Sequence, residues 1–362
     1  MNILYILSTY NINGGTPKKT LDLINGNKYN SFLYTYYENL PQYKKYKANF
    51  EKKCVKILES NHKFNIYRHI NLLLNFIDKN SITIVQTQFF MGEMLGGILQ
   101  FLRPKLKVII TFEGSSSPKG VKRIISNIVY KYINNYVYIS KYVQKEKENI
   151  FNILKLKNSK VIYNGVSKRK NLHILKNDFN HTSLVDIASL SKLKNFDILI
   201  ETMDILINHL HYKDIYLYLI GEGSYRESIE KKINKRLLGN HIKLLGVQDD
   251  IGGVLEQCDI FVHPCYMEGF GLSVVEAMIA KKPIIAANTG AHTELIQHNF
   301  SGLLVDPYNP REWVDSILML KDDMQKSKSL AQAASKRANK KFSEEKYITQ
   351  YMNLYSILKD QQ

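Results

Sequence analysis

The chain has 362 residues, 44% of them hydrophobic, and a formal net charge of +17. This length is enough for two well-buried domains of about 150–200 residues each. The sequence has no apolar run of about 18 or more residues, and residues 1–7 lack the basic region and the length of a signal peptide. We therefore expect a soluble globular protein of the cytosol and exclude a membrane-spanning one.

The cysteines give no sign of a disulfide framework. Cys54, Cys258 and Cys265 are widely spaced along the chain. An odd number of cysteines without metal-ligand spacing is typical of reduced, buried thiols. We therefore expect neither a disulfide nor a zinc site.

The positive charge is concentrated in the first half of the chain. Residues 1–170 contain 28 Lys and Arg and 9 Asp and Glu, a net +19, whereas residues 171–362 contain 22 and 24, a net −2. Such a charge attracts anionic lipid headgroups, phosphorylated acceptors or nucleic acid. The alternative is that these lysines are solvated and have no partner.

Short apolar runs alternate with helical patterns along the whole chain, which indicates βαβ units and parallel sheets. The fold class is therefore α/β, with two similar sheets. We expect domains at residues 1–166 and 183–342, a polar linker at 167–182, and a C-terminal segment at 343–362 that is an amphipathic helix over 343–358. The expected strands cover residues 3–7, 32–36, 82–87, 107–111, 136–139, 160–162, 184–188, 216–220, 242–245, 260–263, 283–286 and 302–305.

A glycine pair follows the first expected strand. Gly14 and Gly15 precede Thr16 and Pro17, which predict a helix with Thr16 as its N-cap and Pro17 as its first residue. Glycines at the carboxyl end of a strand let the backbone approach a ligand closely. The alternative is an ordinary β–α turn, and the missing G-x-G-x-x-G spacing disfavours a dinucleotide.

A second loop, after the strand at 184–188, carries two lysines. Lys192 and Lys194 lie between that strand and a helical pattern. A lysine here can neutralise the negative charge that grows on a diphosphate leaving group. A solvated loop lysine is the alternative. Gly221 and Gly223 form a further, weaker glycine turn after the strand at 216–220.

The most informative stretch of the chain runs from Glu268 to Glu276. Apolar residues recur at helical spacing after Gly271, so we expect a helix to begin at Gly271 or Leu272. Glu268 then precedes the helix, and Glu276, about one turn in, reaches back toward the unpaired N–H groups at its start. Phosphate suits those N–H groups, and the two carboxylates suit hydroxyl groups. The stretch therefore predicts a nucleotide-sugar site.

These glycine and glutamate motifs recur in one known family. Together they resemble the retaining glycosyltransferases of family four, over nearly the whole chain and most strongly from Val185 to Pro307. The resemblance implies the GT-B fold, in which two Rossmann-like domains face a central cleft and the C-terminal helix can return to the N-terminal domain. The matching motifs are Asn13-Gly14-Gly15, Lys194-Asn195, Gly221-x-Gly223, Leu245-Gly246 with Asp250, Glu268 to Ala277 with its glycines, Pro283, and Thr289-Gly290 with Glu294.

The resemblance also assigns roles to residues of the second half. It implies that Glu268 faces the donor sugar, that Glu276 binds the ribose hydroxyls, and that the main chain near Val247 meets the base. The groups that would hold the diphosphate are Lys194, the N–H groups of Phe270, Gly271 and Leu272, and the loop of Gly14 and Gly15. Gly221 and Gly223 belong to the same donor site.

Two features of the sequence depart from the family pattern. Family members usually have an arginine where this chain has Ser189, and Lys192 is the candidate to replace it. Gln86 and Gln88 stand where many relatives have His-x-His, and Glu113 stands where they have the histidine near the acceptor. Glu113 either hydrogen-bonds the sugar or acts on the acceptor hydroxyl, as a third catalytic candidate beside Glu268 and Lys194, or it is a structural carboxylate that pairs with a nearby lysine.

Two histidines lie near the presumed donor loops. His263 ends the strand expected at 260–263, and His292 follows the glycine turn at Thr289-Gly290. A histidine in such a place is more often a structural residue with satisfied ring nitrogens than a catalytic group. We therefore expect a structural role for both.

The resemblance implies a retaining, metal-independent hexosyltransferase that moves a sugar from a nucleotide diphosphate sugar, with UDP favoured over GDP. Its acceptor would be a glycan or lipid-linked glycan, and its product a surface polysaccharide such as capsule or O-antigen. We expect the basic N-terminal half to bind an anionic membrane surface from the cytoplasm, with no cofactor, no metal and no nucleic acid. The alternatives are a catalytically silent partner subunit, a basic nucleic-acid-binding protein, and a nucleotide-sugar epimerase or phosphorylase.

Overall fold

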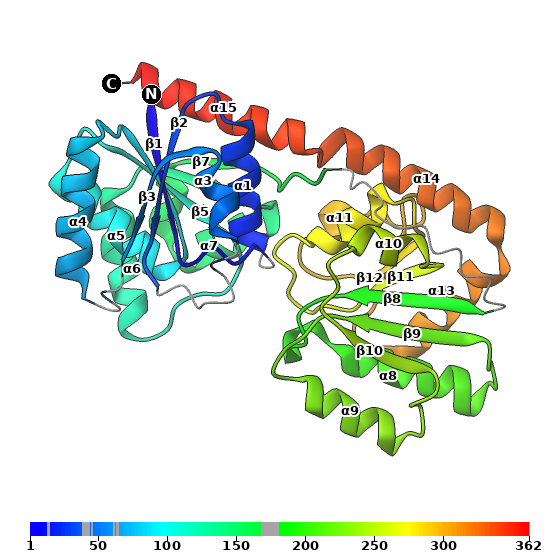
Figure 1. The fold of residues 1–362 in the computed structure, drawn as a ribbon. Helices are drawn as coiled ribbons and strands as arrows, with labels where there is room; N and C mark the ends of the chain where they lie inside the picture. Colours follow the sequence, from blue (N-terminus) through cyan, green and yellow to red (C-terminus); the bar gives the residue numbers. More distant parts are fainter. Residues whose placement is uncertain are drawn as a thin grey trace. The chain divides into compact units, whose positions relative to one another are not determined.

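The computed structural model describes residues 1–12, 15–37, 44, 46–60, 62, 65–167 and 181–361. The chain forms two compact units: Met1–Gly165 together with Glu344–Gln362, and Val166–Ser343. Each unit is a parallel sheet with helices on both faces (Figure 1), so the predicted α/β class with two Rossmann-like sheets is confirmed. The predicted linker lies mostly at residues 168–180, outside the described residues.

The sheet of the first unit is parallel throughout, with its described strands in the order β3-β2-β1-β4-β5-β6-β7. Buried apolar side chains fill its central strands, as expected where helices cover both faces. Its strands are β1 (Asn2–Leu7), β2 (Asn30–Thr35), β3 (Cys54–Glu59), β4 (Ile84–Gln88), β5 (Lys107–Phe112), β6 (Asn135–Tyr138) and β7 (Asn158–Val161).

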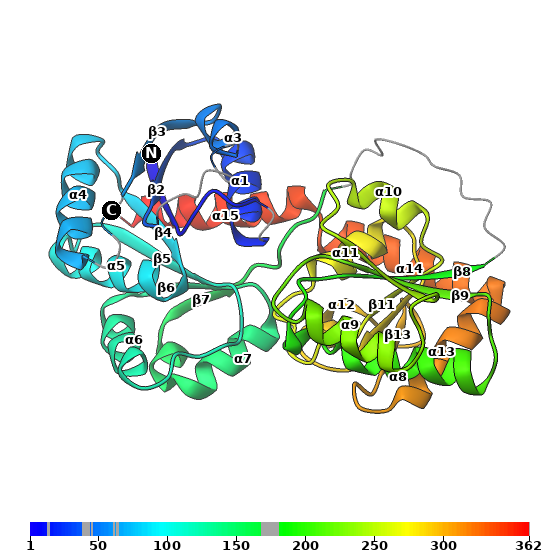
Figure 2. The same cartoon turned by 60° about the horizontal axis from the view of Figure 1, so that its bottom comes forward.

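Helices cover both faces of this sheet (Figure 2). α1, α3 and α15 share one core with the sheet, and Phe76 of α4 packs on Phe32 from the other side, where α4, α5 and α6 are neighbours. The helices are α1 (Gly15–Gly26), α3 (Lys47–Glu51), α4 (Ile66–Lys79), α5 (Phe89–Leu102), α6 (Val121–Tyr132), α7 (Lys141–Ile150) and α15 (Glu344–Asp360), with a 3-10 turn η1 (Asn152–Leu156).

The predicted C-terminal helix is confirmed and belongs to the first unit. Tyr347, Tyr351, Leu354 and Leu358 of α15 are buried on one face. The Tyr347 hydroxyl donates to the Lys19 carbonyl oxygen over 3.4 Å. Helix α15 therefore completes the core that α1 shares with the sheet.

The predicted start of the first helix is wrong. Helix α1 begins at Gly15, so Thr16 lies inside its first turn and is not the N-cap. The Thr16 side chain forms a hydrogen bond with Glu113 instead. Asn13 and Gly14 lie outside the described residues.

The sheet of the second unit is also parallel, in the order β10-β9-β8-β11-β12-β13 among the described strands. Trp313 lies in its core, fully buried, and donates its indole N–H to the Asp306 carbonyl oxygen over 3.0 Å. The strands are β8 (Thr182–Ile187), β9 (Ile215–Ile220), β10 (Ile242–Gly246), β11 (Ile260–His263), β12 (Ile284–Ala287) and β13 (Leu303–Val305).

Helices α8 and α13 pack together in this unit, as do α11 and α14. A π-helical turn, η3, continues α8. The elements are η2 (Lys192–Lys194), α8 (Phe196–Asp204), η3 (Ile205–His209), α9 (Arg226–Lys235), α10 (Ile251–Glu256), α11 (Leu272–Ile279), α12 (His292–Leu295), α13 (Pro310–Asp322) and α14 (Met324–Lys341).

Candidate functional site

The loops at the carboxyl ends of the second sheet converge on Glu268. Because all strands of the sheet are parallel, the loops after β8, β11 and β12 leave it at the same edge. The loop after β11 carries Glu268, the loop after β8 carries Lys194, and the loop after β12 carries Gly290. Three loops that are far apart in the sequence therefore meet around one carboxylate.

Glu268 contacts two cationic or potentially cationic side chains through one oxygen. Its Oε2 lies 2.5 Å from Nζ of Lys194 and 3.2 Å from Nε2 of His263. The Glu268 and Lys194 side chains are 15% and 21% exposed, so water screens this ion pair little. The structure thus brings together two of the three predicted catalytic residues.

Burial and charge act in opposite directions on this cluster. Burial alone would raise the pKa of Glu268, but Lys194 and His263 outweigh it and hold that pKa well below its usual value. Burial would lower the pKa of Lys194, and Glu268 raises it above its usual range. Glu268 is therefore a carboxylate and Lys194 an ammonium at neutral pH.

His263 connects Glu268 to a second carboxylate that the sequence reasoning missed. Nδ1 of His263 lies 2.7 Å from Oδ1 of Asp186, which is fully buried in β8. Burial lowers the pKa of His263, but Asp186 and Glu268 more than compensate and raise it. An aspartate within the otherwise apolar run of residues 184–188 was the sequence signal that could have revealed this residue.

Both histidines near the donor loops are buried. Both ring nitrogens of His263 are hydrogen bonded, as expected of a structural histidine, yet one partner is Glu268. Nδ1 of His292 donates to the Ala287 carbonyl oxygen over 3.0 Å, and burial, followed by the charge of His263, lowers the pKa of His292 to about 3. His292 therefore packs as a neutral ring 5.2 Å from that of His263.

The Glu268 backbone is fixed by a glycine turn. The Ala291 N–H donates to the Glu268 carbonyl oxygen over 3.0 Å. Gly290 has φ +55°, and a Cβ at this position would lie 2.7 Å from that same oxygen. Only glycine allows this approach without strain, so Gly290 sets the position of Glu268.

The glycine turn between the two glutamates forms as predicted. Helix α11 begins at Leu272 and Gly271 is its N-cap, with φ +95°. Phe270 is buried against Phe342, and Glu276 lies half-buried in the second turn of the helix. The first N–H groups of α11 have no partner within the helix, which makes its start suited to an anion.

The remaining predicted donor residues of this unit surround the loop after β8. A Cβ on Gly221 would lie 2.0 Å from the Ala188 carbonyl oxygen, and one on Gly223 2.2 Å from that of Leu190, so both glycines pack directly on this loop. Ser189, Lys192 and Val247 are exposed.

Glu113 and Gly15 lie in the first unit. Burial raises the pKa of Glu113 to about 7, although Thr16 and Lys19 act against this. Glu113 lines a cavity of about 390 Å³ at the carboxyl ends of β4 and β5, together with Phe89, Phe90, Glu93, Phe112, Gly114, Ser116, Ser117, Pro118, Lys122 and Lys147. A carboxyl group with this pKa can both take up and release a proton near neutral pH.

Gln86 and Gln88 are buried on the face of β4 that α1 and α15 cover. The Gln86 amide donates to the Thr111 hydroxyl over 3.2 Å, and its oxygen accepts from Tyr355 of α15. The Gln88 amide lies 3.5 Å from the Thr20 hydroxyl of α1. Both glutamines therefore hold helices on the sheet.

His263, Cys265 and Glu268 present ligand atoms within 4.8 Å of one another, close enough to share a metal ion. The set fits a cation poorly. The Lys194 ammonium already pairs with Glu268, and burial raises the pKa of Cys265 to about 12, which keeps its thiol neutral. The absence of a metal remains a prediction.

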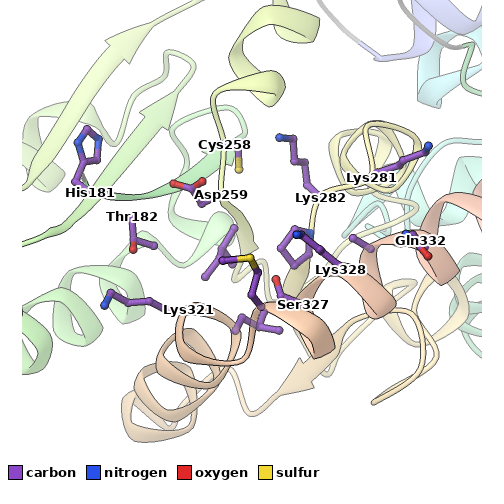
Figure 3. A pocket seen from close by; sticks show the side chains of 15 residues that line it. His181, Thr182, Cys258, Asp259, Lys281, Lys282, Lys321, Ser327, Lys328 and Gln332 are labelled. Carbon is purple, nitrogen blue, oxygen red and sulfur yellow. The ribbon is translucent and has the colours of Figure 1, made fainter. Parts of the chain in front are cut away.

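A cavity of about 530 Å³ in the second unit lies at the opposite end of its sheet, among the amino ends of β8, β11 and β12. Four lysines line it, but Lys321 pairs with Asp214 and Lys282 donates to the Glu256 carbonyl oxygen. The Lys281 and Lys321 side chains extend in opposite directions (Figure 3). These amines do not point toward a common centre, so the Glu268 cluster is the better candidate for the donor site.

Comparison with known proteins identifies the family. Residues 145–337, which are 193 of the 362, match the family described as Glycosyl transferases group 1. The chain belongs to this family. It is 30% identical over 295 residues to an uncharacterized glycosyltransferase of Methanocaldococcus jannaschii, covering 79% of this chain and 78% of that protein. The resemblance and the enzyme class, a nucleotide-sugar-dependent hexosyltransferase, are thereby confirmed.

Further relatives and solved structures agree with this assignment. A poly(ribitol-phosphate) alpha-N-acetylglucosaminyltransferase of Staphylococcus aureus is 26% identical over 240 residues, 66% of this glycosyltransferase and 46% of that protein. The structure of Anabaena HepE in complex with UDP superposes with a TM-score of 0.84 at 20% identity, covering 98% of this chain and all of that one. At this identity the likeness shows the fold, and the fold is the predicted GT-B type.

In the described part of this glycosyltransferase, no helix combines the length and the apolar character that crossing a bilayer requires.

Proposed function

We propose that this glycosyltransferase moves a sugar from a UDP-sugar, with retention at the anomeric carbon, to a glycan or lipid-linked glycan in the synthesis of a surface polysaccharide. The observation that carries the proposal is the position of Glu268. Lys194 and His263 hold its carboxylate, Gly290 fixes its backbone, and the start of α11 follows three residues later.

Each group has a part in the proposed reaction. The diphosphate binds the N–H groups at the start of α11 and the Lys194 ammonium, which has three donors and can keep Glu268 while it binds phosphate. Glu268 faces the donor sugar, and Glu276 binds the ribose hydroxyls. Ser189, Lys192, Gly221, Gly223 and Val247 complete the donor site.

Retention without a metal is served by displacement on one face of the sugar. The bond from the anomeric carbon to the diphosphate oxygen breaks, and a bond to the acceptor oxygen forms on the same face. The acceptor proton passes to the leaving diphosphate, whose charge Lys194 and α11 stabilise. Glu113 is the candidate to position the acceptor hydroxyl in the first unit.

The relatives support the choice of donor and product. The Staphylococcus aureus relative is named for an alpha linkage, and the solved structures of HepE contain UDP. Two Escherichia coli relatives, each 25% identical, are O-antigen biosynthesis glycosyltransferases. A lipid-linked acceptor agrees with the basic first half, which we propose binds the anionic inner face of the cytoplasmic membrane.

The first test is thermal unfolding with a panel of nucleotide-sugars, because a true donor stabilises the fold by mass action. A UDP-sugar should raise Tm and a GDP-sugar should not.

The second test contrasts the two glutamates. Glu268→Gln should lose about a hundredfold in turnover and keep its affinity for UDP, whereas Glu276→Ala should weaken UDP binding in calorimetry. Unchanged turnover in Glu268→Gln would overturn its role.

A further inference from the structure

Helix α6 carries an apolar stripe that faces away from the protein. Val121, Ile124, Ile128 and Tyr132 recur at spacings of three and four residues and are 71%, 62%, 52% and 48% exposed. The opposite side of the same helix buries Val129 and Tyr130 in the core. A surface helix normally presents polar residues to water, so a second apolar side requires another explanation.

The end of α5 extends this stripe. Phe101 and Leu102 are 61% and 41% exposed, and the rings of Phe101 and Tyr132 meet edge to face with centroids 5.3 Å apart. We call these six residues, together with the exposed bases Lys119, Lys122, Arg123 and Lys131, the α6 surface. The helices α5 and α6 pack on each other, so the surface is continuous.

The bases of the α6 surface have almost no acid near them in the chain. Residues 94–145 contain nine Lys or Arg and one acid, Glu113. Lys122, Arg123 and Lys131 of α6 are exposed, as is Lys119 just before it. Arg103 follows Leu102 and forms an ion pair with Asp78 over 2.7 Å. The charge around the stripe is therefore strongly positive.

We propose that the α6 surface docks on an anionic phospholipid bilayer, with its apolar stripe inserted between the headgroups and its bases on the lipid phosphates. Exposed apolar side chains on a helix rich in Lys and Arg are the pattern of an interfacial helix that lies in the plane of the membrane. Charge alone would hold the protein above the headgroups. The stripe adds apolar contact, which depends less on salt.

The α6 surface lies beside the cavity of the first unit. Lys122 belongs to α6 and lines that cavity, where its Nζ lies 5.5 Å from the centroid of the Phe90 ring. A docked molecule therefore holds the Glu113 cavity next to the lipid headgroups. A lipid-linked acceptor can then reach Glu113 while its lipid stays in the bilayer. This inference about the acceptor rests on the proposed function.

Vesicle sedimentation of the full chain tests the docking. Phosphatidylcholine mixed with phosphatidylglycerol should bind the protein, and Ile124→Gln with Ile128→Gln should weaken binding about tenfold. Arg123→Gln with Lys131→Gln should weaken binding to the mixed vesicles and reduce its dependence on the anionic lipid, while Lys119 and Lys122 keep part of the attraction. Leu237→Gln is the matched control, since Leu237 is 86% exposed in the second unit, and should bind as the wild type does.

Tryptophan fluorescence tests insertion directly. The native Trp313 is fully buried, so Ile128→Trp adds a reporter whose emission should shift to the blue on mixed vesicles, whereas Leu237→Trp should not shift. Wild-type protein that stays in the supernatant, or an Ile124→Gln and Ile128→Gln protein that binds like the wild type, would overturn the proposal. So would loss of self-association in that variant with vesicle binding unchanged, because the stripe would then cover a second copy.

The vesicle assays contain no sugar donor. Their failure would leave the thermal shift with UDP-sugars intact, and a missing thermal shift would leave vesicle binding intact. The docking proposal and the proposed function can therefore fail separately.

Discussion

Lys194 and Glu268 form an ion pair with 2.5 Å between Nζ and Oε2, although they are 74 residues apart in the sequence. The pair keeps Glu268 ionised and holds the ammonium where the proposed diphosphate would meet it. The fold thus sets the positions of the two residues relative to each other.

Replacement of Lys194 should therefore impair both residues. In Lys194→Gln we expect the affinity for UDP to fall about tenfold or more, because a charge-assisted hydrogen bond to phosphate is lost. The affinity for uridine, which has no phosphate, should change little. Calorimetry with the two ligands measures the difference. For Lys192→Gln, whose lysine is exposed on the same loop, we expect a smaller loss. An unchanged affinity of Lys194→Gln for UDP would contradict the assignment.

The sequence predicted only those parts of this site whose residues lie close together in the chain. The glycine turn, the helix start at Leu272 and the pair of glutamates lie within nine residues, so helix-start rules and the family motif were sufficient. Asp186 was missed because its partner His263 is 77 residues away, and no spacing rule links two strands that become neighbours only in the folded sheet. The role of His263 depends on the same contact with Asp186, so the sequence could not reveal it either.

Asp186 should act on Glu268 through His263. Asp186→Asn removes the charge that raises the pKa of His263, so the ring should lose its proton at a lower pH. A neutral ring can still donate from Nε2 to Glu268, but this hydrogen bond is then no longer charge-assisted and holds the carboxylate less firmly. We expect the alkaline limb of the kcat profile to move about one pH unit lower, with KM for the donor little changed. A uniform loss of activity with the same pH profile would indicate a structural role only.

Gly290 should tolerate no side chain. In Gly290→Ala, the residue keeps φ near +55° and its Cβ meets the Glu268 carbonyl oxygen at 2.7 Å, so either the turn is strained or Glu268 moves. We expect unfolding in urea to be easier by about 1–3 kcal/mol, with loss of turnover. Gly239→Ala is the control, because its Cβ would meet only Asn234 Oδ1, at 4.0 Å. Equal stability of the two variants would refute the argument.

The fold was predicted more completely than the site. Each expected strand has an observed counterpart because buried parallel strands are short apolar runs bounded by polar residues. β3 was missed for the opposite reason. It is an edge strand, its residues are only partly buried, and Val55 is 63% exposed, so it carries no continuous apolar run. Gln86 holds α15, a contact made across 269 residues of sequence that no local pattern reveals.

The pH dependence of stability should report on Glu113. Its pKa is about 7 in the folded protein, against 4.5 as its ordinary value. Between these two values the folded protein keeps a proton that the unfolded chain has released, so the free energy of unfolding falls as pH rises through this window and is constant above it. The loss is at most about 3 kcal/mol.

Glu113→Gln is neutral at every pH and should remove this loss. Urea denaturation of both proteins at about pH 5 and about pH 8 measures it: the wild type should become less stable relative to the variant as pH rises. Equal changes in the two proteins would mean that Glu113 titrates as in water. A carboxyl group that is half ionised near pH 7, and that lines the same cavity as Lys122 and Phe112, is suited to accept the hydrogen bond of an acceptor hydroxyl. The same variant should therefore lower transfer to the acceptor while the thermal shift with the donor stays unchanged.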